Sequence, residues 1–130
     1  MTIRIVRLGS ERNPKEGIRI GTVRRPPRGV PKSDHAKRNF YDVWLPTLAP
    51  SEPLLKAAQA DLGDERAWKT FVRKYRAEMK TADNRALLAT LAALSHRTDF
   101  SVGCYCADEA RCHRSVLREL LAECGAEVAP

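Results

Sequence analysis

Residues 99–124, DFSVGCYCADEARCHRSVLRELLAEC, carry the pattern that decides the fold. Residues 99–106 place four apolar or sulfur-bearing side chains on one face of a predicted strand: Phe100, Val102, Cys104 and Cys106. Residues 110–124 have the spacing of an amphipathic helix that Gly125 ends at the left-handed cap position. The short segment 126–130 can add a last strand, and a strand–helix–strand unit of this length is typical of a crossover in a parallel sheet.

Upstream, two further strands are predicted near the N-terminus. Residues 2–8 and 17–25 alternate apolar and polar side chains, and the turn-forming residues between them are compatible with a hairpin. Residues 24–50 are basic and rich in proline, which predicts an ordered loop rather than a strand. Within this loop, residues 41–45 form a short buried or edge segment.

Three helices are predicted between the loop and the cysteine-rich stretch. Ser51, Asp64 and Asp83 are the expected N-caps of these helices. The second helix carries one apolar stripe that we assign to the core, formed by Trp68, Phe71, Val72, Tyr75 and Met79. The chain therefore predicts one compact α/β domain over residues 1–130, with a largely parallel central sheet flanked by helices.

Composition narrows the class of protein. Apolar residues make up 43% and charged residues 30%, which is typical of a folded globular protein. No stretch is apolar over the roughly 20 residues that a membrane span requires, and residues 1–13 do not resemble a secretion signal. The four cysteines cluster late in the chain rather than forming a disulfide framework, so we expect a cytoplasmic protein.

Positive charge is concentrated in the first third of the chain. The formal net charge is +7; residues 1–40 hold 11 Lys/Arg against 3 Asp/Glu, a net of +8. Such a surface attracts phosphate-bearing partners, and nucleic acid is one candidate class, whereas a solvated basic loop is the alternative. A basic run alone specifies no ligand.

The leading functional hypothesis concerns the start of the last helix. Cys112 is the candidate thiolate and His113 its proton partner, because a helix N-terminus and cationic neighbours lower the pKa of a thiol. Arg114 and Arg111 are the candidate donors to a small anionic or phosphate-bearing ligand. The remaining predicted ligand-binding residues are Ser115, and Arg25 and Arg28 of the basic loop, which could close over the site.

A second hypothesis is a metal site. Cys104, Cys106 and Cys112 could hold zinc or iron, since thiolates suit both ions. His113 is an awkward fourth ligand, because neighbouring side chains on a helix diverge by about 100°. Cys124 is expected in the core, about 18 Å from Cys112 along the helix. Whether the protein is an enzyme, and its oligomeric state, stay open.

The order of blocks along the chain resembles a known family. GIRI, PPRGVPKSD, LAPSEPLLKA, AWKTFVRKYRAEM and GCYCADEARCHRSVL follow one another as in the domain-of-unknown-function family 488, in particular its YeaO-like branch of uncharacterised bacterial proteins. The resemblance spans about residues 3–128 and implies a compact α/β fold with a largely parallel sheet, but no activity. Arg24, Arg25 and Pro26 stand where that branch usually has Asp and Trp before Pro-Arg-Gly, and Cys106 stands where many members have Glu.

Overall fold

A four-stranded parallel sheet forms the centre of the molecule in this computed structural model, which describes residues 1–130. The strands lie in the order β1-β4-β2-β3. Their bounds are Ile3–Arg7 for β1, Ile18–Gly21 for β2, Val43–Trp44 for β3 and Phe100–Cys104 for β4. The predicted α/β class with a largely parallel sheet is confirmed, and every pairing in the sheet is parallel.

The predicted hairpin between the first two strands is wrong. Phe100 of β4 is opposite Ile3 of β1 on one side and Ile18 of β2 on the other, so β4 lies between them. All five residues of β4 are buried, as expected of a central parallel strand that is covered on both faces. The last strand is reduced to one bridge, in which Val128 pairs with Ile3.

Four α-helices follow the predicted order. They are α1 (Glu52–Ala60), α2 (Glu65–Glu78), α3 (Ala82–Leu94) and α4 (His113–Glu123). Asp64 caps α2 by accepting from the N–H groups of Arg66 and Ala67, as predicted. The predicted cap of α3 is wrong by two residues, because Thr81 accepts from the Asn84 N–H and Asp83 lies inside the first turn. No helix is long and apolar enough to cross a membrane.

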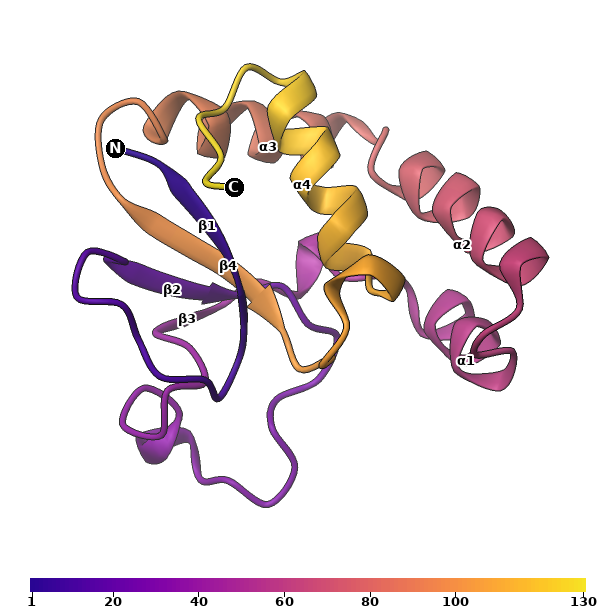
Figure 1. The fold of residues 1–130 in the computed structure, drawn as a ribbon, viewed down its shortest axis with the longest axis horizontal. Helices are drawn as coiled ribbons and strands as arrows, with labels where there is room; N and C mark the ends of the chain where they lie inside the picture. The colour runs from indigo at the N-terminus through magenta and orange to yellow at the C-terminus, as the bar shows by residue number, and fades with distance from the viewer.

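The helices gather on one side of the sheet and enclose the main core (Figure 1). The apolar stripe of α2 points into this core, as predicted, with Phe71, Tyr75 and Met79 buried. They pack with residues of β1, β4, α3 and α4 that include Ile3, Val102, Leu88, Leu91, Val116, Leu117 and Leu121. The start of α4, which follows β4, therefore lies against this core and against α2.

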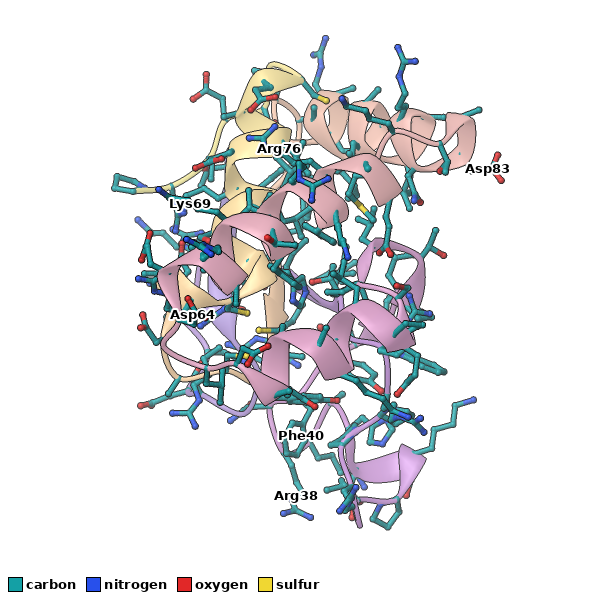
Figure 2. The ribbon with its side chains drawn as sticks, turned by 90° about the vertical axis from the view of Figure 1, so that its right-hand side faces the viewer. Arg38, Phe40, Asp64, Lys69, Arg76 and Asp83 are labelled. Carbon is teal, nitrogen blue, oxygen red and sulfur yellow. The ribbon has the colours of Figure 1, made fainter.

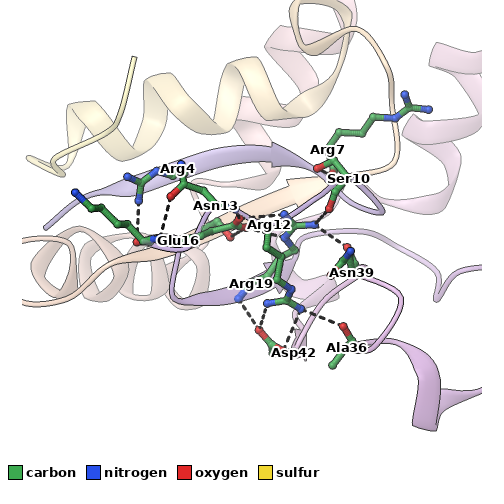
Figure 3. Close-up of polar contacts among 12 residues, drawn as sticks. Arg4, Arg7, Ser10, Arg12, Asn13, Glu16, Arg19, Ala36, Asn39 and Asp42 are labelled. Atoms are coloured by element: carbon green, nitrogen blue, oxygen red, sulfur yellow. Dashed lines mark hydrogen bonds and ion pairs between the residues drawn. The ribbon is translucent and has the colours of Figure 1, made fainter.

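Coil segments cover the other face of the sheet through a buried ion pair (Figure 3). Arg19 of β2 donates from Nε to Glu16 at 2.7 Å, and both side chains are at most 2% exposed. Arg19 also donates to the carbonyls of Ser10 and Asn39, and the Ser101 hydroxyl of β4 donates to Glu16. These bonds fasten residues 9–17 and the middle of the basic loop, at Asn39, to the sheet.

The basic loop is ordered by its own contacts. Arg24 donates to the carbonyls of Ala49 and Pro50, and Arg25 pairs with Glu52 of α1 at 2.8 Å. The loop contains the short helix Lys32–Asp34 and the exposed edge strand β3. A second short helical turn, Pro46–Leu48, leads into α1.

Candidate metal centre

The β4–α4 connection brings three cysteine sulfurs together. The Sγ atoms of Cys104, Cys106 and Cys112 all lie within 4.8 Å of one another. Cys104 is the last residue of β4, and Cys112 is the N-cap of α4. The short 3-10 helix Glu109–Arg111 turns the chain back between them, capped by Asp108, which accepts from the Ala110 N–H. We call these three residues the cysteine cluster.

The members of the cysteine cluster differ in burial. Cys104 and Cys112 are 2% and 3% exposed, whereas Cys106 is exposed. The preceding Gly103 permits this arrangement, because a Cβ atom there would lie 2.4 Å from the carbonyl oxygen of Val6 on β1. The cluster thus has a buried base and one sulfur that reaches the surface.

Cys124 does not belong to the core, contrary to prediction. It is exposed at the C-terminal end of α4. The helix begins at His113 rather than at 110, so Cys112 is its cap and the inward face is set by Val116, Leu117 and Leu121. Cys112 and Cys124 therefore do not lie on one inward face of the helix, and only Cys112 is buried.

His113 is a buried, neutral imidazole beside the cluster. Its Nε2 lies 2.7 Å from the Thr22 carbonyl, and its Nδ1 lies 3.8 Å from Cys112 Sγ. Burial lowers the pKa of His113 to about 4, so the ring is uncharged at neutral pH. The carbonyl of Thr22 can only accept, so Nε2 carries the proton and Nδ1 presents a lone pair to the cluster.

Arg114 is a buried cation without a carboxylate partner. It is 3% exposed, and one terminal nitrogen donates to the Cys106 carbonyl at 2.7 Å. Its Nε has no hydrogen-bond partner, and no acidic side chain forms an ion pair with it. A buried guanidinium requires a nearby negative charge. Glu109 lies near enough for Arg114 to help lower its pKa, but this carboxylate is paired with Arg118, so the cysteine cluster is the further group that can supply negative charge.

Within the cluster, negative charge is favoured on Cys106. Hydrogen bonds from the Cys104 and Cys112 thiols, aided by the charge of Arg114, lower the pKa of Cys106. Contact with Cys104 acts to lower the pKa of Cys112, but Cys106 and burial outweigh it and raise that pKa to about 11. Although Cys112 lies at the N-terminus of α4, its pKa in the unliganded cluster is therefore raised rather than lowered.

A small apolar cavity of about 100 Å³ opens beside the cluster. Cys106, Cys112 and His113 line one end of it. Its other walls come from α1, α2 and the turn between them, and 8 of its 14 lining residues are hydrophobic. Figure 2 shows sulfur atoms in yellow between the α1 and α2 ribbons, close to the labelled Asp64, which lines the same cavity.

The predicted ligand-binding residues are dispersed. Arg111 lines the cavity, but it pairs with Glu65 and lies over the Trp68 ring at 5.7 Å. The Ser115 hydroxyl donates to the Cys112 carbonyl at 2.9 Å. Arg25 is held by Glu52, and neither it nor the exposed Arg28 lines the cavity. The basic loop touches the cysteine segment through the Tyr105 hydroxyl, which donates to the Arg25 carbonyl.

The apolar wall of the cavity was not foreseen from the sequence. Leu55, Ala58 and Leu62 recur at the spacing of one helix face, which is the signal that could have placed α1 over a site. This spacing does not show which part of the chain packs against the apolar face. Only the packing of α1 against α2 brings this face to the cysteine cluster.

Comparison with known proteins gives a family. A family model described as DUF488-N3a, the active DUF488-N3 subclade, matches residues 3–125. The match includes the whole sheet, all four helices and the cysteine cluster. Neither the curated proteins nor the solved structures compared with the chain gave a match.

Proposed function

The chain belongs to the DUF488 family, within its DUF488-N3 subclade, and from the geometry of its site we propose that it binds a thiophilic metal ion, zinc or iron, through Cys104, Cys106 and Cys112. The observation that carries the proposal is the convergence of three sulfurs within 4.8 Å. Placement in the YeaO-like branch and a bacterial origin stay predictions from the sequence.

The spacing of the sulfurs suits such an ion. Zinc–sulfur bonds of about 2.3 Å in a tetrahedral site place the sulfurs about 3.8 Å apart. The three Sγ atoms lie within 4.8 Å of one another, so small side-chain rotations reach that geometry. All three cysteines are free thiols rather than members of a disulfide.

The charge of the neighbouring Arg114 also suits a metal ion held by three thiolates. Three thiolates around a divalent ion sum to a net charge of −1, and the buried Arg114 supplies +1 beside them. This pairing explains a guanidinium that is buried without a carboxylate. Arg114 also holds the Cys106 carbonyl, so it orients the loop that carries one of the three ligands.

The cavity makes this an open metal site. Structural zinc sites have four protein ligands, whereas catalytic sites have three and leave one position for water or substrate. Here three sulfurs form the cluster, and two of the cysteines line a cavity. We therefore propose that the protein binds and activates a small molecule at the metal rather than using the ion only for stability.

The test is metal content with cysteine variants. Protein purified without added metal should contain about one equivalent of zinc or iron by elemental analysis. Each of Cys104→Ser, Cys106→Ser and Cys112→Ser should lower zinc affinity at least tenfold, whereas the exposed Cys124→Ser is the matched control and should leave it unchanged. Metal-free protein whose melting temperature does not respond to zinc would contradict the proposal.

A second candidate is a thiol-dependent enzyme without metal, in which a cysteine acts as nucleophile. The lowered pKa and exposure of Cys106 favour this residue over Cys112. Alkylation by iodoacetamide, followed by mass spectrometry of each cysteine, separates the two candidates. A nucleophile predicts fast alkylation of Cys106 that added zinc does not change, whereas the metal centre predicts protection by one equivalent of zinc.

A further inference from the structure

We infer that the cavity beside the cysteine cluster binds small alkyl thiols, with the sulfur at the metal and the hydrocarbon chain against α1 and α2. The inference rests on the proposed metal centre and names the class of ligand that the open position takes. Four properties of the cavity support this ligand: its volume, its apolar walls, the pairing of its charged side chains, and the cysteine sulfurs at one end.

The size of the cavity restricts the ligand. A cavity of about 150 Å³ with apolar walls holds benzene, which has six heavy atoms. The volume here is about 100 Å³, so a ligand of about four heavy atoms fills it by the same ratio. Nucleotides, sugars and peptides are too large to be enclosed.

The walls favour a hydrocarbon chain. Ala58 and Leu55 face the cavity from α1, and Ala67, Trp68 and Phe71 face it from α2. Phe71 is buried and stacks between Trp68 and Tyr75, so this wall is fixed by packing. An apolar group placed here loses its contact with water at no cost in unpaired hydrogen bonds.

The polar groups of the cavity disfavour an anionic ligand. Arg111 is the only Lys or Arg that lines it, and Glu65 and the Trp68 ring already hold this guanidinium. Asp64 accepts from the N–H groups of α2, and Asp61 adds a further negative charge at the rim. A carboxylate or phosphate tail would therefore find no free cation there.

The thiolate ligands of the metal ion favour a ligand that binds through sulfur. An ion held by thiolates is soft and takes a further sulfur readily. On binding, the thiol releases its S–H proton to solvent, and a sulfur lone pair forms the bond to the ion in place of a water molecule. No oxidant or further reactant is needed for this exchange.

Cobalt provides the spectroscopic test. Wild-type protein loaded with one equivalent of Co²⁺ under anaerobic conditions is titrated with 1-propanethiol and with 2-mercaptoethanol, each of which has four heavy atoms. We expect saturable changes in the cobalt ligand-field bands, with 1-propanethiol binding at least tenfold more tightly because its terminal methyl replaces a hydroxyl. Equal affinity for the two thiols would overturn the inference.

Cavity variants localise the binding. Ala58→Leu fills the cavity, whereas Ala57→Leu adds the same side chain to an exposed position of α1 that does not line it. We expect Ala58→Leu to weaken 1-propanethiol at least tenfold and Ala57→Leu to leave it unchanged, with cobalt bands intact in both. Ala67→Leu makes the same change from α2 and replaces Ala58→Leu if that variant does not fold.

The two proposals fail in different ways. Absence of cobalt ligand-field bands in wild-type protein overturns the metal centre and the inference with it. Normal cobalt bands that do not respond to 1-propanethiol overturn only the inference and leave the metal centre standing. Thiol binding that Ala58→Leu and Ala67→Leu do not weaken overturns the placement of the hydrocarbon chain.

Discussion

The two buried arginines, Arg19 and Arg114, differ in how their positive charge is compensated. The guanidinium of Arg19 has a carboxylate partner in Glu16 and donates to two backbone carbonyls, so its charge is balanced within the fold. Arg114 has one carbonyl partner, an unpaired Nε and no carboxylate. The first arginine fastens coil to sheet, whereas the second interacts with the charge of Glu109 without an ion pair and lies beside the cysteine cluster, whose negative charge would compensate it further.

Replacement of Arg114 therefore tests the charge balance of the cluster. We expect Arg114→Gln to lower zinc affinity about 10- to 100-fold, as loss of an outer contact to a metal site commonly does. Arg73→Gln, at an exposed position of α2, is the control and should bind zinc as the wild type does. Competition with a chromophoric chelator measures both, and equal affinities would show that Arg114 has no electrostatic role.

The lowered pKa of Glu16 makes the stability of the fold depend on pH. Burial acts to raise the pKa of Glu16, but hydrogen bonds from Arg19 and Ser101 outweigh it and hold the pKa below its ordinary value of 4.5. Because the pKa is lowered on folding, the stabilisation is present above pH 4.5 and is lost as pH falls through the folded value.

Glu16→Gln should remove that dependence. At pH 7 the variant leaves Arg19 buried without a counter-charge, which costs about 3–5 kcal/mol. Thermal unfolding followed by circular dichroism between pH 3 and pH 7 should show a steep fall in melting temperature for the wild type below pH 4.5 and a shallower one for Glu16→Gln. Parallel curves would contradict this role of Glu16.

At the scale of elements, β4 and α4 were predictable because their patterns are local. The alternation from Phe100 to Cys104 and the amphipathic spacing after Cys112 each lie within one segment. The hairpin failed because the partner of β1 is β4, about a hundred residues later, and adjacent alternating segments carry no sign of that. Likewise, the sequence placed Cys112 at a helix start but could not show that its sulfur is buried against two others.

Gly103 sets how closely β1 approaches β4 before the cluster. In Gly103→Ala the added Cβ would lie 2.4 Å from the Val6 carbonyl, so the strands must separate and Cys104 must shift. We expect a loss of about 1–3 kcal/mol in stability and weaker zinc binding. Urea unfolding measures the first, with the exposed Thr98→Ala as control; unchanged stability would show that β1 adjusts freely.

At the scale of the whole molecule, the site joins distant parts of the chain. The cysteines come from residues 104–112, the imidazole is held by Thr22, and the cavity wall comes from residues 55–71. The charge asymmetry that the sequence shows is partly internal, since Arg12, Arg19 and Arg25 pair with Asp42, Glu16 and Glu52. Composition counts charges but cannot show which are paired: of the two predicted ligand donors in the basic loop, Arg25 pairs with Glu52, whereas Arg28 is exposed.

Metal binding should therefore stabilise the entire fold. An ion that binds only the folded chain adds about 2.7 kcal/mol at a free concentration of 100 times its dissociation constant, which raises the melting temperature on the order of 10 °C for a chain of this length. Removal of zinc by a chelator should reverse this shift in the wild type and in Cys124→Ser. In Cys106→Ser, by contrast, zinc should raise the melting temperature by half as much or less, because the exposed sulfur of the cluster is gone. Calorimetry at fixed free zinc measures these shifts, and an equal zinc response in Cys106→Ser would place the ion elsewhere in the molecule.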